Sequence, residues 1–336
     1  MGELETNRKG AGRSARISAV LFVIAFLAVL GGYGGIMESG ENVDAFISHS
    51  SANRSVASKL EKSLETAGLQ VWLDDSEITL GVLLGKELQD SIRASRVLIL
   101  LWSSHAASSR WVRSEWLTAF HLNRYIVPCA LDDTFLPQCL QGDTFLRIRQ
   151  VTEPIVDSLL RAVREAPGSS NPLAPVMRPE SSEVNAAGYQ IAAGQKALLE
   201  QLGEREFTKA EQLQVLLSDA VEKTLKVWPY QPLIVNLAGY NLKNAYMLKH
   251  WDAIQAGRAP DDPLLAQAEE KFFDTLAIDP TDPSALNGLG SILMFRRDLD
   301  AAEFFVLAAL AQAERLNIDY PEARADLDLI HQFKSP

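Results

Sequence analysis

The sequence predicts a chain with two folded parts, an α/β domain built on a parallel sheet and an all-helical region after it. Three observations lead to this prediction. Short apolar runs alternate with segments of helical spacing between residues 43 and 165, whereas only helical spacing is found from residue 185 onwards. An uncharged apolar stretch at 17–37 precedes both parts. The length of 336 residues and the apolar content of 47% suit two or three globular domains.

The leader, residues 1–42, is expected to contain a transmembrane helix. Residues 17–37 carry no charge, and a helix of this length covers the roughly 30 Å core of a bilayer. Two alternatives stay open. The run ISAVLFVIAFLAVL is also typical of a signal-peptide core, and Met37 is an alternative start of translation, which would leave the leader without a structural role.

The charges beside this stretch predict its orientation. By the positive-inside rule, basic residues before the stretch keep the N-terminus in the cytoplasm and place the rest of the chain outside. This orientation conflicts with the function implied below, which needs a cytoplasmic substrate. The basic residues are Arg8, Lys9, Arg13 and Arg16, and the acidic residues that follow are Glu38, Glu41 and Asp44.

The α/β domain is expected at 43–165. Its apolar runs show no polar alternation, so both faces of each strand are buried and helices cover both sides of a doubly wound parallel sheet. A ligand site is expected at the C-terminal ends of the strands, near the switch in strand order. The expected strands are 43–48, 69–75, 96–103 and 125–131, and the expected helices are 54–68, 86–95 and 110–123.

A linker at 166–184, rich in proline and serine, leads to the helical region at 185–336. Part of this region resembles a tetratricopeptide repeat (TPR), an array that presents a concave surface to a peptide or protein partner. The alternative is a generic array of helical hairpins that only oligomerises. The motif positions are occupied by Leu286, Leu289, Gly290, Leu293, Ala302 and Ala309, and one period earlier by Ala268, Phe272 and Pro280.

Charge and composition exclude several functions. The net charge of −11 lies mostly in residues 166–336, with 24 acidic and 15 basic side chains, and no run of lysine and arginine occurs in the α/β domain. Nucleic acid is therefore disfavoured as a partner. Two cysteines, Cys129 and Cys139, and five scattered histidines supply no metal-binding spacing, so no metal or other cofactor is expected.

Three motifs make residues 43–165 resemble a TIR domain. They are Asp44-Ala-Phe-Ile-Ser-His-Ser50 at the first strand, Gly68-Leu-x-Val-Trp-x-Asp-Asp75 before the loop that the family calls the BB loop, and Trp111-x-x-x-Glu115. The resemblance implies a flavodoxin-like fold with a five-stranded parallel sheet. It also implies self-association with other TIR domains.

Many members of this family hydrolyse NAD+ at the nicotinamide–ribose bond with one glutamate, and by resemblance that glutamate is Glu115. Trp111 and Glu115 are four residues apart on one helix, so both side chains lie on one face. Glycoside hydrolysis commonly needs two carboxylates, but the nicotinamide of NAD+ is already a cationic leaving group. The ring of Trp111 would offer a stacking face. The alternative for Glu115 is a solvated helix glutamate.

The remaining candidate residues lie at strand ends. Ser48, His49 and Ser50 are expected to contact the ribose or phosphates of the substrate, or else to be turn residues that cap the helix after them. Asp74 and Asp75 would contact substrate or begin the BB loop. Among the other rings, Trp72 is expected in the core, and His105 and His121 are expected at the surface or in packing.

The first functional hypothesis is an NAD+ glycohydrolase that also has access to cyclic ADP-ribose products. TIR assembly would activate it in antiphage defence, innate immunity or cell-death signalling, and the repeats would sense a signal or bind a partner. The alternative is a non-catalytic TIR adaptor in signal transduction, and a third hypothesis is a secreted or surface effector. Because NAD+ is cytoplasmic, the TIR domain is expected in the cytoplasm, tethered by residues 17–37 or soluble if translation starts at Met37.

Overall fold

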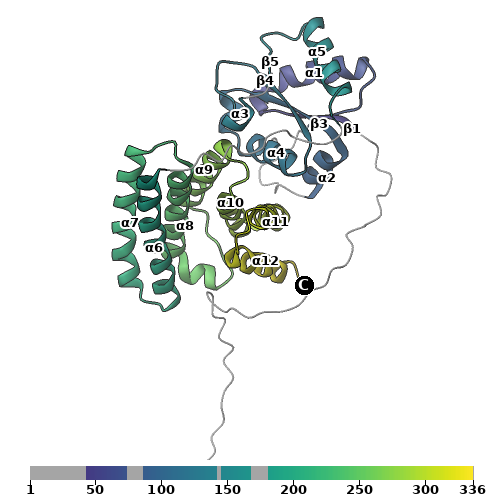
Figure 1. Cartoon of the computed structure of the whole chain (residues 1–336). Helices are drawn as coiled ribbons and strands as arrows, with labels where there is room; N and C mark the ends of the chain where they lie inside the picture. Colours follow the sequence, from purple (N-terminus) through teal and green to yellow (C-terminus); the bar gives the residue numbers. More distant parts are fainter. Residues whose placement is uncertain (1–42, 74–85, 142–144, 168–180, 336) are drawn as a thin grey trace, which may run out of the picture.

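The structure is a computed structural model, and it describes residues 43–73, 86–141, 145–167 and 181–335. These residues form an α/β part and an all-helical part (Figure 1). The leader with the expected transmembrane helix lies outside the described residues, as do Asp74 and Asp75. None of the helices that the structure describes is long and apolar enough to cross a membrane.

The α/β part is built on a parallel five-stranded sheet, which confirms the expected fold class. The strands follow the order β2-β1-β3-β4-β5, so the chain moves outward from β1 to β2 and then returns to the other side of β1. This reversal places the switch point between β1 and β3. The strands are β1 Val43–Ser48, β2 Val71–Leu73, β3 Ser95–Trp102, β4 Tyr125–Ala130 and β5 Leu146–Arg147.

Helices cover both faces of this sheet (Figure 1). Alternate residues of β1 point to opposite faces, so Ala45 and Ile47 pack in one apolar cluster with α1 and α5 while Phe46 packs in another with α2 and α4. The helices are α1 Arg54–Thr66, α2 Lys86–Ala94, α3 Ser104–Ser108, α4 Arg110–His121 and α5 Glu153–Arg164, with short 3₁₀ turns η1 Ser51–Asn53 and η3 Gln138–Leu140.

The prediction that Trp72 lies in the core is wrong, because its side chain is 48% exposed. Trp72 pairs in register with Phe46 and faces the same side of the sheet. However, β2 is an edge strand, and α2 packs on β1, β3 and α4 further in. The described helices therefore leave the ring partly uncovered. Three further elements, α3, β5 and α5, were not predicted from the sequence.

Small residues allow the helices of the second part to pack closely. A Cβ atom on Gly239 of α8 or on Gly288 of α10 would lie 2.7 or 2.4 Å from the ring of Phe272 on α9. These two glycines therefore create the space that the aromatic ring fills. The helices are α6 Ser182–Gly203, α7 Phe207–Val227, α8 Pro232–Gln255, α9 Pro263–Ile278, α10 Pro283–Phe295, α11 Leu299–Arg315 and α12 Pro321–Lys334.

The two parts share one apolar cluster. Buried side chains on the α2–α4 face of the sheet, such as Trp116, belong to the same cluster as Phe272 and Phe273 of α9. The helical part approaches the sheet domain with α9, which also contacts η3, while α6 and α7 lie on the far side (Figure 1). Helix α4 is therefore packed between the sheet and α9.

Candidate functional site

The candidate site lies at the switch point, where β1 and β3 end side by side. Ser48, the last residue of β1, is in register with Leu100 of β3, and β3 continues to Trp102 before the chain turns into α3. In open α/β sheets this edge is where ligands bind, because the loops diverge there and leave a crevice. The first-strand residues Ser48, His49 and Ser50 all reach it.

Glu115 enters the site from the second turn of α4. The helix begins after Ser109, whose hydroxyl accepts a hydrogen bond from the backbone N–H of Val112 at 3.3 Å. Glu115 is only 2% exposed, so it is not the solvated helix glutamate of the alternative interpretation. Its buried carboxylate needs polar partners, because an uncompensated buried charge is costly.

The hydroxyl of Ser48 is one such partner. Ser48 Oγ donates a hydrogen bond of 2.5 Å to Glu115 Oε2, and Ser48 itself is fully buried. The structure thus brings together two of the predicted site residues. The prediction that Ser48 contacts substrate remains a prediction, but its hydroxyl is committed to the carboxylate.

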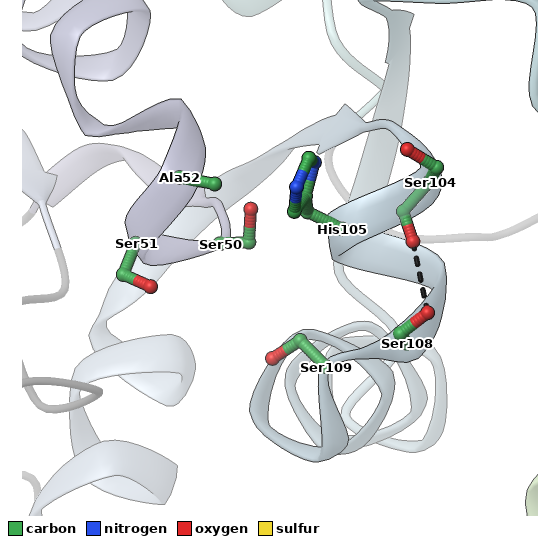
Figure 2. A pocket seen from close by; sticks show the side chains of 7 residues that line it. All are labelled: Ser50, Ser51, Ala52, Ser104, His105, Ser108 and Ser109. Atoms are coloured by element: carbon green, nitrogen blue, oxygen red, sulfur yellow. Dashed lines mark hydrogen bonds between the residues drawn. The ribbon is translucent and has the colours of Figure 1, made fainter.

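A pocket of about 440 Å³ opens at the loop that follows β1. It lies between η1 on one side and α3 with the N-terminal end of α4 on the other, and the ring of His105 projects from α3 toward Ser50 (Figure 2). Hydroxyl groups dominate the lining, which suits a ligand with many hydrogen-bonding oxygens. The lining residues are Ser50, Ser51, Ala52, Ser104, His105, Ser108 and Ser109. Glu115 and Trp111 do not line this pocket, whereas Ser50, two residues after Ser48 and directly before η1, does.

A hydrogen-bond network holds the walls of the pocket in place. Asn53 Oδ1 accepts hydrogen bonds from Ser50 Oγ at 2.6 Å and from Ser103 Oγ at 2.7 Å. Ser103 Oγ in turn accepts from the backbone N–H of Ala106 at 3.1 Å. This network ties the loop after β1 to the start of α3 and fixes the width of the pocket between them.

Asp132, after β4, supports the same edge of the sheet. Its carboxylate accepts hydrogen bonds of 2.9 Å from the backbone N–H groups of Ser104 and Thr134. Burial opposes ionisation, but these hydrogen bonds lower the pKa of Asp132 to about 2. Asp132 therefore stays ionised at neutral pH and anchors the first residue of α3.

The opposite face of α4 is bound by the helical part. Arg110 Nε lies 2.8 Å from Glu269 Oε1, and Arg296 Nη1 lies 2.5 Å from Glu269 Oε2, so one buried carboxylate joins two guanidinium groups. Arg113 Nη2 lies 2.6 Å from Glu270 Oε2, and its guanidinium carbon lies 4.6 Å from the ring centroid of Phe273. All three acidic or aromatic partners are on α9.

His121, the last residue of α4, adds another contact between the parts. Its Nε2 lies 3.0 Å from the backbone carbonyl of Pro280. Burial lowers the pKa of His121 to about 4, against a smaller opposing effect of this hydrogen bond. His121 is therefore neutral at pH 7, and it is a packing residue, as expected.

The other predicted residues have mixed outcomes. His49 is 6% exposed beside Ser48, which leaves its role in binding as a prediction. Trp111 is half-buried and packs against the apolar cluster that includes Trp116, so its role as a stacking face is also untested. The expected roles of Asp74 and Asp75 concern residues outside the described part of the chain.

Most residues of the pocket were not predicted from the sequence. Ser104, His105, Ser108 and Ser109 line it, and Asn53 and Ser103 support it. The available signal was the run of serines directly after the apolar strand at 96–103, because parallel strands place the residues that follow them at the ligand-binding edge. His105 is exposed, as expected, and it also faces this pocket.

Comparison with known proteins agrees with this geometry for one part of the chain. Neither the curated proteins nor the solved structures include a match to the chain. Residues 45–160, however, match the model of the TIR domain family. The parallel sheet and the site at its switch point thus belong to a TIR domain at residues 45–160.

Proposed function

We propose that this protein is an NAD+ glycohydrolase that cleaves the nicotinamide–ribose bond. The observation that carries the proposal is the buried carboxylate of Glu115, bound by Ser48 at the switch point of the TIR sheet. TIR domains in general act in signalling or in NAD+ hydrolysis. A solvent-exposed glutamate would favour the signalling role alone, whereas a desolvated carboxylate acts strongly on charge that develops next to it.

The reaction would need one carboxylate. The bond between the nicotinamide nitrogen and C1′ of the ribose breaks, and the electron pair of that bond neutralises the pyridinium, so the leaving group needs no proton. Positive charge then develops at C1′ and the ring oxygen, where the carboxylate of Glu115 would stabilise it. Water adds to C1′ and releases a proton, which gives nicotinamide and ADP-ribose. An adenine nitrogen of the same molecule in place of water would give a cyclic product.

The hydroxyl-rich pocket would hold the rest of the substrate. Ser50, Ser104 and Ser109 present hydroxyl groups, and His105 presents ring nitrogens, toward a volume of about 440 Å³. Ribose hydroxyls and a diphosphate are ligands of this hydrogen-bonding character. His49, Trp111, Asp74 and Asp75 complete the proposed substrate-binding set, and no cofactor is proposed.

The test is to incubate the purified full chain with NAD+ and resolve the products by chromatography. Glu115→Gln keeps the shape of the side chain but removes its charge, so nicotinamide release should fall by at least about 100-fold, a typical cost of losing one electrostatic group in a site. Glu65→Gln changes an exposed glutamate of α1 and should leave the rate unchanged. A folded Glu115→Gln protein with the wild-type rate would refute the assignment.

The second candidate function is a non-catalytic adaptor that pairs with other TIR domains. The observation in its favour is the exposure of large apolar side chains on the TIR domain, since Phe135 is 86% exposed and Phe145 40% exposed. Self-association through such surfaces is part of both proposals. Wild-type and Glu269→Gln proteins that assemble but release no nicotinamide would favour the adaptor, because the variant weakens the contact between α4 and α9.

We further propose that the helical part is a TPR-like module that regulates the site. The close packing of Phe272 against Gly239 and Gly288 supports paired helices of this kind. Their concave side would bind a peptide or protein partner. The contacts of Arg110 and Arg113 with α9 would then restrain the helix that carries the catalytic glutamate until a partner binds. NAD+ depletion on activation suits defence or cell-death signalling.

The proposed location follows from the substrate. The TIR domain would face the cytoplasm, tethered by residues 17–37 or soluble if translation starts at Met37, because NAD+ is abundant there. Positive-inside counts are a bias that the acidic flanks weaken. Protease added to intact cells should therefore leave a C-terminal tag uncut, and digestion of the tag without lysis would favour an exported effector.

A further inference from the structure

The side chains of Ser48 and Glu115 form a buried pair between the sheet and α4. Ser48 lies two residues after Phe46 on β1, so both side chains point to the face of the sheet that α4 covers. Glu115 points back toward the sheet from α4, next to Trp116 in the shared apolar cluster. The hydroxyl and the carboxylate therefore meet in the layer between sheet and helix.

The backbone that carries Ser48 is fixed by its neighbours. Strand β1 lies between β2 and β3, and Ser48 is paired in register with Leu100. An interior strand paired on both sides is among the least mobile parts of a fold. The Ser48 hydroxyl is accordingly a donor at a fixed position.

The direction of the Glu115 carboxylate, in contrast, is not set by the backbone that carries it. The last side-chain torsion of glutamate is broad, so the rotamer alone does not set the direction in which the two oxygens point. A charge-assisted hydrogen bond with a fixed donor does set it. The bond from Ser48 Oγ to Glu115 Oε2 at 2.5 Å supplies this constraint.

We propose that Ser48 is a positioning residue for the reaction: its hydroxyl holds the Glu115 carboxylate in the orientation that catalysis needs, and it does not bind the substrate. This inference rests on the proposed NAD+ glycohydrolase function. Ser50, two residues further along, differs because its side chain lines the pocket. The two serines of the first-strand motif, Ser48 and Ser50, are thus assigned different roles: Ser48 orients the carboxylate and Ser50 faces the ligand.

The role predicts a specific kinetic pattern for the full chain with NAD+. Ser48→Ala should lower kcat by about 10- to 100-fold, because a small misplacement of a catalytic group costs this much, and should leave KM nearly unchanged. Ser48→Thr keeps the hydroxyl and should recover most of kcat. Ser50→Ala, in contrast, should mainly raise KM.

Ser95→Ala is the matched control. Ser95 is a buried serine at the first residue of β3, and its hydroxyl donates to the carbonyl of Ser91 at 2.8 Å. It lies at the opposite end of the sheet from the site, so its removal tests the loss of a buried hydroxyl alone. The wild-type kcat is expected for this variant.

A second measurement does not depend on turnover. The free energies of unfolding of the wild type, Ser48→Ala, Glu115→Gln and the double variant form a double-mutant cycle. If the two residues interact, the change in the double variant differs from the sum of the changes in the single variants. Should Ser48→Ala fail to fold, Ser48→Cys replaces it in both experiments, because a thiol is a weaker donor and should give an intermediate kcat.

The outcomes distinguish failure of the positioning role of Ser48 from failure of the proposed NAD+ glycohydrolase function. Additive unfolding free energies, an unchanged kcat in Ser48→Ala, or a raised KM as its main effect would each overturn the positioning role while the wild type still releases nicotinamide. A chain that releases no nicotinamide either as the wild type or as Glu269→Gln, which weakens the contact with α9, overturns the proposed function and the positioning role with it.

Discussion

Glu269 offers the sharpest test of how the helical part acts on the site. Its carboxylate lies between Arg110 of the TIR domain and Arg296 of the helical part, and its side chain is only 6% exposed. Glu269→Gln keeps the size of the side chain and removes the charge. Two guanidinium groups that share one carboxylate would then face each other without it.

The magnitude follows from the exposure of the three groups. Removing one partner of a fully buried pair costs about 3–5 kcal/mol, whereas an exposed pair contributes about 0–1 kcal/mol. Arg110 is 28% exposed and Arg296 is 22% exposed, so screening places the cost between these limits, at about 2 kcal/mol. A change of this size raises the fraction of molecules with separated parts by about 30-fold.

Two assays detect the weakened contact between α4 and α9. Hydrogen exchange should become faster in peptides from α4 and α9, which lose their contact, and nicotinamide release should rise because the restraint on α4 is weakened. Glu222→Gln is the control: Glu222 lies 2.6 Å from Lys226 within α7, and both side chains are about 70% exposed. This control should change neither quantity.

The reasoning about Glu269 would be refuted by either of two results. Unchanged exchange in α4 would mean that the ion pairs do not hold the parts together. Faster exchange with a lower rate of nicotinamide release would mean that α9 supports the catalytic helix and does not restrain it.

Three further predictions follow from the same structure. The pKa of His121, about 4 when folded and about 6.5 when unfolded, means that the unfolded chain takes up a proton first; stability should therefore fall by about 2 kcal/mol between pH 7 and pH 5, and a urea-unfolding series should show a smaller fall in His121→Asn. Gly288→Ala should lower the melting temperature through a clash with Phe272, at a cost of about 1–3 kcal/mol, and adding Phe272→Leu should recover part of it. A chain that ends near Pro167 should be weakly active when dilute and more active when crowded; activity per molecule that is independent of concentration would argue against assembly as the switch.

The sequence allowed the local features of the TIR domain to be predicted well. Continuous apolar runs predicted parallel strands, and the first-strand and Trp-x-x-x-Glu motifs led to Ser48 and Glu115. The spacing along β1 and α4 fixes which face each side chain takes. It does not give their mutual distance, because 67 residues separate them in the chain, so the hydrogen bond between them was found only in the structure.

Features that depend on long-range packing could not be predicted. Trp72 has the residue type of a core position, but its exposure depends on how far α2 reaches across the sheet edge. Arg113 binds Glu270, which is 157 residues away in the chain. No local pattern encodes such a pairing, because its two halves are each ordinary surface sequence.

These contacts give α4 two functions on opposite faces. Arg113 and Glu115 are two residues apart, which on an α-helix is about 200° of rotation, so one binds α9 while the other faces the sheet. The hydrogen bond from Ser48 orients the carboxylate from the side of the sheet, whereas the ion pairs with α9 act on the other side of the same helix. The two contacts are therefore separable. Ser48→Ala removes the orientation of the carboxylate and should lower kcat, whereas Glu269→Gln weakens the contact with α9 and leaves the hydrogen bond from Ser48 in place.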